Sequence, residues 1–519
     1  MPAAVLLVLA WAGPYPHPSF LRDSSTWVYG AQVILAGGIP FRDFWGNPEA
    51  STYINAVALA FGKPVLPTLF FLDIAYSLLV LAAAAWALSR VVSPWIGAAA
   101  LVWMVLLFRE PAIFQGGNLT EQHALLPVFL SAGCALRSLT ANGRSLLVWA
   151  GLCGFFTGLA LLCRESWVSI APALLVGNAL RSPGLSLRDW LRLTAVAAAA
   201  AALPVLALVA AYLVIGVTPG QLWDQGPVYD SLYEVPPGRH LLRLAWQSLQ
   251  RHPELLAIPA ALLLRLLAEL FARRARRWWP PGPVAAFLLT MLAFDIYQWG
   301  RPGYFYGHYY MMLVASTTLL GAWALEGAAQ AVPAATAVLR PVLAVASAAA
   351  LMAFAFPTAT TESPNGLRAL LAGRTIPTPA LQTAVLDEIA RRCPAGAPML
   401  VWGYEPRLYD LSGHRAASTY FYLFPLEMAG YQNAAKVGDL TRQVESAQPC
   451  VIVYPLWDQD SVIHSLYPPL EASERLGWVN PQAGDQRQAY QDFSPLYPYV
   501  AAHYRREVVG RYEVYVRRT

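Results

Sequence analysis

The sequence predicts a multi-pass α-helical membrane protein of about eleven transmembrane helices, with a small C-terminal α/β domain outside the membrane. Three observations support this fold class. Of the 519 residues, 57% are hydrophobic and only 13% are charged, whereas a soluble protein carries about 25% charged residues. The apolar residues gather in runs, such as 193–215, that approach or reach the ~20 residues needed to cross a bilayer as a helix. The loops between the runs alternate in arginine content, as expected for the two sides of a membrane.

Hydrophobic runs bounded by Gly, Pro or charged residues give the expected spans in chain order. They are 1–13, 65–88, 94–108, 121–138, 146–162, 167–180, 193–216, 254–271, 283–299, 309–326 and 341–356. The first run is short and has no basic residue before it. It fits a tilted span or a span that begins further upstream. A signal peptide is the alternative, because Ala10-Trp11-Ala12 has the small-x-small form of a cleavage site.

Short loops rich in arginine predict which ends of the spans face the cytoplasm. These loops carry Arg90, Arg137, Arg144, Arg181, Arg188, Arg192, Arg273, Arg274, Arg276, Arg277 and Arg340. The opposite loops hold most of the acids, aromatics and prolines, and comprise about 14–64, 109–120, 164–166, 217–253 and 300–308. Counting spans, we expect residues 1–356 to form a transmembrane domain in the cytoplasmic (inner) membrane. Residues 357–519 then form an extracytoplasmic domain.

The C-terminal domain has the pattern of a small α/β fold. The expected elements are an amphipathic helix at 378–392, strands at 399–403 and 450–454, and a hairpin at 508–516. Cys393 and Cys450 both lie in this tail and could form a disulfide if it faces an oxidising compartment. The other cysteines lie in or beside apolar runs and are expected to be packing residues. The net charge of +5 is spread over loops without a basic patch interleaved with aromatics, so we expect no nucleic-acid partner.

The first outer loop contains two acids with aromatic residues between them, Asp23 and Asp43. Asp23 could cap a helix at 24–35, since Asp is a favoured N-cap, or act as a general base. Asp43 could form a catalytic pair with Asp23, in which one carboxylate acts as general base and the other binds a metal ion or a hydroxyl group. Alternatively, Asp43 could be a solvated turn residue. The residues alone leave both alternatives open.

Four segments together resemble the GT-C class of membrane glycosyltransferases, especially protein O-mannosyltransferase-like enzymes and bacterial lipopolysaccharide aminoarabinose and galacturonic acid transferases. The first segment resembles the first outer loop of that class. It contains Asp23, Tyr29 and Ala31 in the pattern Asp-x5-Tyr-x-Ala, then a helix, then Gly37-Gly38-Ile39-Pro40-Phe41-Arg42-Asp43. The others are Gly117-Asn118-Leu119-Thr120-Glu121-Gln122-His123-Ala124, Tyr306-Gly307-His308-Tyr309-Tyr310, and 401–409 with 411–413. Each motif is short, and their shared order along the chain carries the resemblance. One departure is Asn47-Pro48-Glu49-Ala50, where several relatives have Lys-Pro-Pro.

The resemblance implies an inverting transfer of a hexosyl or pentosyl group from a polyprenyl-phosphate donor to a lipid, glycan or protein acceptor. It implies membrane lipids as partners and leaves a divalent metal ion as a possible cofactor. The catalytic candidates are Asp23, as the base that accepts the hydroxyl proton, and Asp43. The substrate-binding candidates are Glu121, Arg301, His308, Tyr309 and Arg164, with the arginines and the histidine on the lipid phosphate. The alternatives are helix-terminal charge stabilisation for Glu121, interfacial anchoring for the arginines, and an aromatic belt for the tyrosine.

Two other functions compete with this interpretation. A transporter or flippase would place ionisable residues within spans, and Asp73, Asp295 and Arg265 are the candidates. No inverted repeat or pair of broken helices accompanies them, and a large folded tail favours an enzyme. A non-catalytic envelope-assembly subunit would have the same sequence features as the enzyme. Only loss of function on changing Asp23 would separate these two.

Overall fold

A computed structural model describes most of the chain as two compact units. The described residues are 23–46, 49–62, 65–108, 111–165, 167–181, 184–233, 282–301, 307–331, 380–427, 430–456, 493 and 495–518. The first unit consists of 1–17, 69–211 and 236–375, and the second of 18–68, 212–235 and 376–519. The predicted domain boundary after residue 356 lies outside the described residues.

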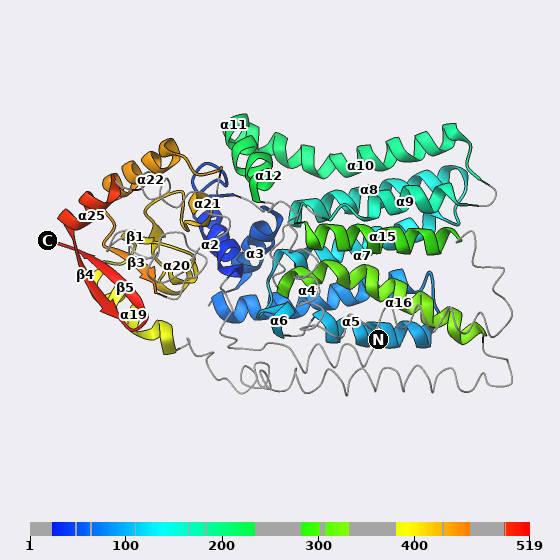
Figure 1. Ribbon diagram of the computed structural model, residues 1–519, viewed down its shortest axis with the longest axis horizontal. Helices are drawn as coiled ribbons and strands as arrows, with labels where there is room; N and C mark the ends of the chain where they lie inside the picture. Colours follow the sequence, from blue (N-terminus) through cyan, green and yellow to red (C-terminus); the bar gives the residue numbers. More distant parts are fainter. Residues whose placement is uncertain are drawn as a thin grey trace, which may run out of the picture. The chain divides into compact units, whose positions relative to one another are not determined.

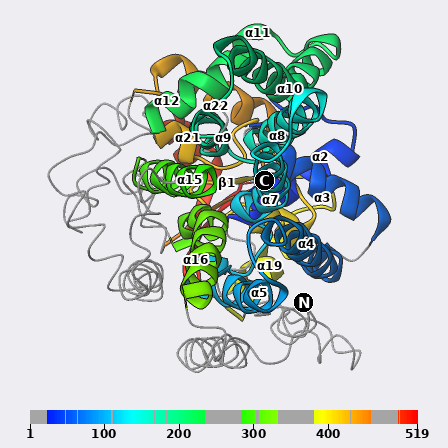
Figure 2. The ribbon, with the colours of Figure 1, turned by 90° about the vertical axis from the view of Figure 1, so that its right-hand side faces the viewer.

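The first unit is a group of helices, most of them long, that lie side by side (Figure 1). They are α4 (Val65–Leu88), α5 (Pro94–Phe108), α6 (Pro111–Phe114), α7 (Thr120–Ser138), α8 (Gly143–Cys163), α9 (Ile170–Ala179), α10 (Leu187–Val214), α15 (Pro283–Gly300), the 3-10 turn η4 (Gly307–Tyr310) and α16 (Met311–Ala331). The view along the helices places α7 near the middle of the group (Figure 2), and almost all of its side chains are buried. The N-terminal end of α7 is therefore an enclosed position.

These helices coincide with the predicted spans within the described residues, while the spans expected at 1–13, 254–271 and 341–356 lie outside them. Of the described helices, those at 67–88, 143–163, 187–214 and 307–330 are long and apolar enough to cross a membrane. Shorter apolar helices lie at 50–61, 94–105 and 170–179. The structure thus confirms a helical membrane protein, and the total of eleven spans stays a prediction.

Small residues allow α8 to approach α10 closely. A Cβ added to Gly154 would lie 2.0 Å from the carbonyl oxygen of Ala197, and one added to Gly158 would lie 2.2 Å from that of Ala201. Spacing of two small residues by four positions is common where membrane helices touch, because dispersion contacts rather than water exclusion drive their association. The three free cysteines, Cys134, Cys153 and Cys163, are buried among these helices, as predicted.

The second unit combines a five-stranded sheet with helices from distant parts of the chain (Figure 1). Its elements are α2 (Ser24–Leu35), α3 (Glu49–Phe61), α11 (Pro219–Trp223), the π-helix η1 (Asp224–Val228), α12 (Tyr229–Tyr233), α19 (Ala380–Arg392), β1 (Pro398–Val401), α20 (Arg407–Ser412), β2 (Arg415–Ala416), α21 (Phe424–Glu427), α22 (Ala434–Ala447), β3 (Val451–Pro455), α25 (Leu496–His503), β4 (Tyr504–Val509) and β5 (Tyr512–Arg517). The strand order is β2-β1-β3-β5-β4, with β1 parallel to both β2 and β3, and β5 antiparallel to both β3 and β4. The predicted helix, strands and C-terminal hairpin are all present.

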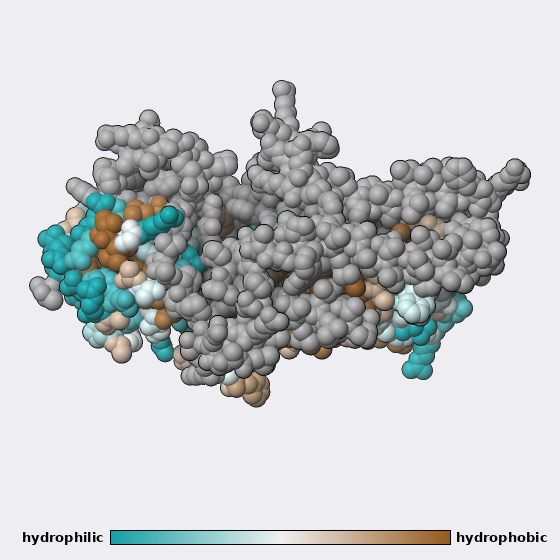
Figure 3. All heavy atoms as spheres, turned by 90° about the horizontal axis from the view of Figure 1, so that it is seen from below, coloured by the Kyte–Doolittle hydropathy of each residue, from teal (hydrophilic) through white to brown (hydrophobic). Residues whose placement is uncertain are grey.

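Both faces of this sheet are covered, which explains why all five residues of β3 are buried. Ile452 and Tyr454 pack with α22 and α25 on one face, while Val451 and Val453 pack on the other face with α19. The second core also contains Tyr29, Phe44 and Trp45 from the first outer loop. At the end of this unit that carries β4 and β5, the visible surface is mainly hydrophilic around a smaller hydrophobic group (Figure 3).

A disulfide joins Cys393, at the end of α19, to Cys450, at the start of β3. The two Cα atoms are 5.4 Å apart, within the usual range for a disulfide. This confirms the predicted pairing. Disulfides persist mainly in oxidising compartments, so the bond is relevant to the side of the membrane on which the tail lies.

Candidate functional site

Asp23 directly precedes α2, but its carboxylate makes no capping hydrogen bond to the helix. Its backbone carbonyl accepts from Thr26 N, at 3.1 Å. The capping interpretation of this side chain is therefore wrong. The carboxylate lies close enough to Tyr422 that its charge acts with burial to raise the pKa of that phenol above its usual value. Tyr422 belongs to the C-terminal part of the same unit, and no pattern in the sequence indicated that it would lie near Asp23.

Asp43 forms a small self-contained turn on the surface. It pairs with Arg42 at 2.9 Å and accepts from Ile39 N at 2.8 Å. The hydrogen bond from Arg42 comes first among the causes that hold the pKa of Asp43 below its usual value. The structure thus places Asp43 in the turn that one of the two interpretations expected. A role in binding or catalysis stays a prediction.

The loop after this turn is fixed by Gln225 of the π-helix η1. Its amide nitrogen donates to the carbonyl of Phe41 at 2.8 Å, and its amide oxygen accepts from Gly46 N at 3.2 Å. Phe41 has a φ of 66°, in the left-handed region that disfavours residues other than glycine. Gln225 therefore holds both ends of a strained loop. Gln225 was not among the predicted site residues, and its only signal was its place in the predicted outer loop 217–253.

Aromatic and charged contacts connect the same loop to the C-terminal elements of the unit. Trp45, Tyr229 and Tyr431 form a triangle of edge-to-face rings with centroids 5.0–5.4 Å apart. Tyr431 also donates to Asp224 at 2.6 Å, and Lys436 pairs with the other oxygen of that carboxylate at 2.8 Å. These contacts give the first outer loop a defined conformation.

The first unit contains a second group of candidates, reached through a tight loop before α7. Gln115, Gly116, Gly117 and Asn118 all have φ between 47° and 93°. A Cβ on Gly117 would lie 2.5 Å from the ring of Phe114 and 2.7 Å from Asp73 Oδ1, so only glycine fits there. Asp73 accepts from the Gln122 side chain, whose own oxygen accepts from Asn118 N at 2.8 Å. This network fixes the entry to α7.

Four of the predicted substrate-binding residues come together at this end of α7, and we call them the Arg164 cluster: Glu121, Arg164, His308 and Tyr309. Arg164 pairs with Glu121 Oε1 at 2.6 Å, and its guanidinium lies over the Tyr309 ring at 4.4 Å. His308 Nε2 lies 3.9 Å from the same Glu121 oxygen. The Arg164 side chain is only 14% exposed and is paired with Glu121. Interfacial anchoring alone would not require such a partner inside the unit.

Gln115 orients the histidine of this cluster. Its Oε1 lies 3.1 Å from His308 Nδ1, which therefore carries the hydrogen and donates. The other ring nitrogen then faces Glu121. Gln115 was not among the predicted residues, and its only signal was its place in the predicted outer loop 109–120.

Arg301, the remaining candidate, ends α15 and is exposed. The residues that follow, 302–306, lie outside the described part of the chain, so its role stays a prediction. Among the transporter candidates, Asp295 is buried in α15, and Arg265 lies outside the described residues.

The described residues do not provide a metal site, because no three His, Cys, Asp or Glu side chains among them converge. Glu121, the acid of the Arg164 cluster, is instead paired with an arginine. We therefore assign no step to a metal ion, and the divalent metal cofactor that the sequence left open stays untested.

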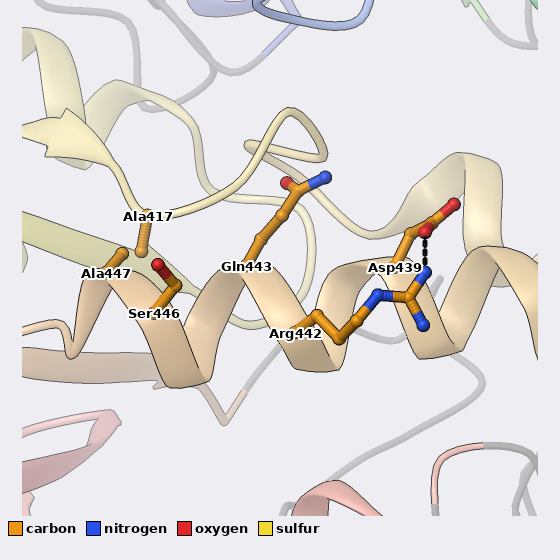
Figure 4. Close-up of a pocket in the computed structure, with 6 residues that line it drawn as sticks. All are labelled: Ala417, Asp439, Arg442, Gln443, Ser446 and Ala447. Carbon is orange, nitrogen blue, oxygen red and sulfur yellow. Dashed lines mark hydrogen bonds and ion pairs between the residues drawn. The ribbon is translucent and has the colours of Figure 1, made fainter.

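One open pocket of about 340 Å³ lies in the second unit, along α22 (Figure 4). Its polar lining is Asp439, Arg442, Gln443 and Ser446, and Asp439 and Arg442 are paired with each other. Gln443 uses its amide oxygen to accept from Thr419 N at 2.8 Å. These side chains are engaged in local structure, and the pocket contains none of the predicted site residues.

Comparisons with solved structures show the fold. The chain is similar to ArnT from Cupriavidus metallidurans bound to undecaprenyl phosphate, with a TM-score of 0.56 and 14% identity over 99% of this chain and 96% of that one. It is also similar to an oligosaccharyltransferase from Archaeoglobus fulgidus in complex with Zn and sulfate, with a TM-score of 0.52 and 13% identity over 94% and 70% of the two chains. The oligosaccharyltransferase AglB from the same organism, in complex with an inhibitory peptide and a dolichol-phosphate, gives 0.51 and 12% over 88% and 68%.

No family model matches the chain, and a comparison with curated proteins finds no match. The structural likeness nevertheless covers most of this chain in each case. The chain therefore has the fold of the GT-C membrane glycosyltransferases, as its sequence motifs predicted.

Proposed function

We propose that the protein transfers a sugar from a polyprenyl-phosphate donor to an acceptor on the outer face of the cytoplasmic membrane, with inversion at the anomeric carbon. The observation that carries this proposal is the Arg164 cluster, on a fold shared with a transferase that has been crystallised with undecaprenyl phosphate. Arginine suits phosphate because its planar guanidinium offers paired N–H donors. The acceptor is a lipid, glycan or protein hydroxyl, and the sugar is a hexose or a pentose.

In the proposed reaction, the acceptor oxygen forms a bond to the anomeric carbon as the bond from that carbon to the phosphate oxygen breaks. The electron pair of the broken bond stays on the phosphate, and the acceptor proton passes to a base. Arg164 and His308 would stabilise the charge that grows on the leaving phosphate, so no proton donor to the leaving group is needed. Asp23 is the proposed base, since the resemblance of the first outer loop to that of the GT-C enzymes places an acid at this position.

Three features are consistent with chemistry outside the cytoplasm. The disulfide between Cys393 and Cys450 favours an oxidising compartment for the tail. The arginine-rich loops lie on the opposite side of the predicted spans from the candidate residues. Residues 357–519 would then form an extracytoplasmic domain, and its described residues share a compact unit with the described residues of the first outer loop. Arg301 is a second candidate for the donor phosphate.

The proposal is tested by binding of undecaprenyl phosphate to the purified full chain in lipid nanodiscs. Arg164→Ala should weaken binding about ten- to hundredfold, because it removes charge-assisted hydrogen bonds of ~1.5–3 kcal/mol. Arg137→Ala is the matched control, since Arg137 also lies over an aromatic ring, that of Trp149, but belongs to the last turn of α7. Equal effects of both variants, or no binding by the wild type, would exclude the Arg164 cluster as a phosphate site.

Turnover separates the enzyme from the competing functions. With a donor whose sugar is accepted, the wild type should release polyprenyl phosphate and yield a glycosylated acceptor. Binding of the lipid without transfer across a panel of hexosyl and pentosyl donors would favour the assembly subunit. Movement of the intact donor across the membrane of liposomes that contain the protein would favour a flippase.

A further inference from the structure

We infer that Glu121 is a counter-anion built into the phosphate site, which limits the site's charge so that the polyprenyl-phosphate product can leave after transfer. The inference rests on the proposed function. It begins from a feature that phosphate binding alone does not explain: a carboxylate placed against the arginine that would meet an anion. A negative charge there must oppose phosphate binding.

The position of Glu121 fits a backing role rather than contact with ligand. Its side chain is 2% exposed, whereas those of Arg164 and His308 are 14% and 12% exposed. Thr120 donates to Glu121 Oε2 at 2.9 Å, which leaves Oε1 for Arg164 at 2.6 Å and His308 at 3.9 Å. The carboxylate is thus enclosed and fixed, while the side chains of Arg164 and His308 keep some exposed surface.

Two further contacts keep this arrangement together. Glu121 lies in the first turn of α7, where the helix dipole favours a negative charge. Arg164 is held from another side by the ring of Tyr309, so its position does not depend on Glu121 alone. Replacing Glu121 with glutamine keeps a polar group of the same size and removes only the charge.

The charge balance distinguishes donor from product. A sugar-linked polyprenyl phosphate is a phosphodiester with one negative charge, whereas the released monoester approaches two charges above its second pKa of about 6. Arg164 carries one positive charge, and Glu121, paired with it at 2.6 Å, balances that charge. A site whose arginine is balanced in this way does not gain the full attraction of the second product charge. Without Glu121 the product would bind more tightly than the donor and would delay the next cycle.

The experiment measures binding of two probes to the full chain in nanodiscs of neutral lipid at pH 8: undecaprenyl phosphate and its methyl phosphodiester. Glu121→Gln should tighten monoester binding by about tenfold or more, since a single charge within 4–6 Å shifts an ionic equilibrium by one unit or more. Diester binding should tighten less, so the ratio of the two affinities should rise. Arg164→Ala should weaken the binding of both probes. The two partners of one ion pair would then change the affinity in opposite directions.

The ratio of affinities does not depend on the fraction of folded protein, so a partial loss of folding in Glu121→Gln leaves the test intact. If Glu121 is only a structural partner of Arg164, Glu121→Gln will weaken the binding of both probes equally. That result overturns the inference while the proposed function stands. A wild type that binds neither probe overturns the proposed function and this inference with it.

Discussion

Replacing Asp23 with asparagine should abolish transfer without weakening the fold. A true N-cap contributes about 0.5–2 kcal/mol, but the Asp23 carboxylate makes no capping hydrogen bond, so that loss should not appear in the free energy of unfolding. Removal of a general base lowers turnover by about 10²-fold or more, equivalent to roughly 2.7 kcal/mol in the barrier. The assay compares the turnover number and the thermal unfolding midpoint of both proteins in the same nanodiscs.

Asn433→Ala provides a matched control for the stability measurement. Asn433 caps α22, and its side-chain oxygen accepts from Lys436 N at 3.0 Å. This variant should cost about 1 kcal/mol and leave turnover unchanged, the reverse of the result expected for Asp23→Asn. Turnover within a few-fold of wild type for Asp23→Asn would refute the assignment of the base. A large loss of stability in the same variant would show that the carboxylate supports the fold.

Three further outcomes follow from the second unit. Replacing Cys393 and Cys450 with alanine should lower the free energy of unfolding by up to about 4 kcal/mol, because the bond spans 57 residues and loop-closure entropy grows with that length. The urea midpoint of the tail measures this loss, and an unchanged midpoint would contradict the prediction. The lowered pKa of Asp43 means that its turn is stabilised above the usual Asp pKa and loses this support as pH falls through the lower folded value. Arg42→Ala should move the Asp43 carboxyl titration to higher pH, as followed by NMR. A reporter active only in the cytoplasm, fused after Thr519, should be inactive, and strong activity would reverse the predicted topology.

Much of the fold was predictable because each element is encoded locally. Long apolar runs can satisfy their backbone hydrogen bonds in a bilayer only as helices, so hydropathy located α4, α8 and α10 well. The strands of the tail were visible for a similar reason. β3 is covered on both faces and is therefore a continuous apolar run, 451–455, rather than an alternating one.

The grouping of the elements into two units was not predictable in the same way. The amide of Ala416 donates to Tyr29 OH at 2.9 Å across 387 positions of sequence. No local pattern at either residue specifies the other as its partner. The sequence thus identified the first outer loop and the tail as separate segments, and the structure shows that they share one core.

The candidate site was predictable as a set of residue types but not as a set of contacts. Glu121, Arg164 and His308 were recognisable as charged groups at the ends of apolar runs. That Arg164 would pair with Glu121 depends on the turn between α8 and α9, and that Gln115 would bond His308 depends on the left-handed run 115–118. Asp23 illustrates the converse, because its local sequence favoured a cap that the backbone conformation does not form.

The core shared by the first outer loop and the tail has a consequence for how the chain is made. Tyr29 leaves the ribosome early, and Ala416, whose backbone N–H donates to the Tyr29 hydroxyl, follows 387 residues later. At a synthesis rate of 5–20 residues per second, the aromatic side chains of the loop wait about 20–80 s for the partners that will bury them. During that interval Tyr29, Phe44 and Trp45 are without the core they share in the finished protein. A chain whose synthesis stops before β3 therefore presents an exposed aromatic loop, which marks it for chaperones or proteases as unfinished.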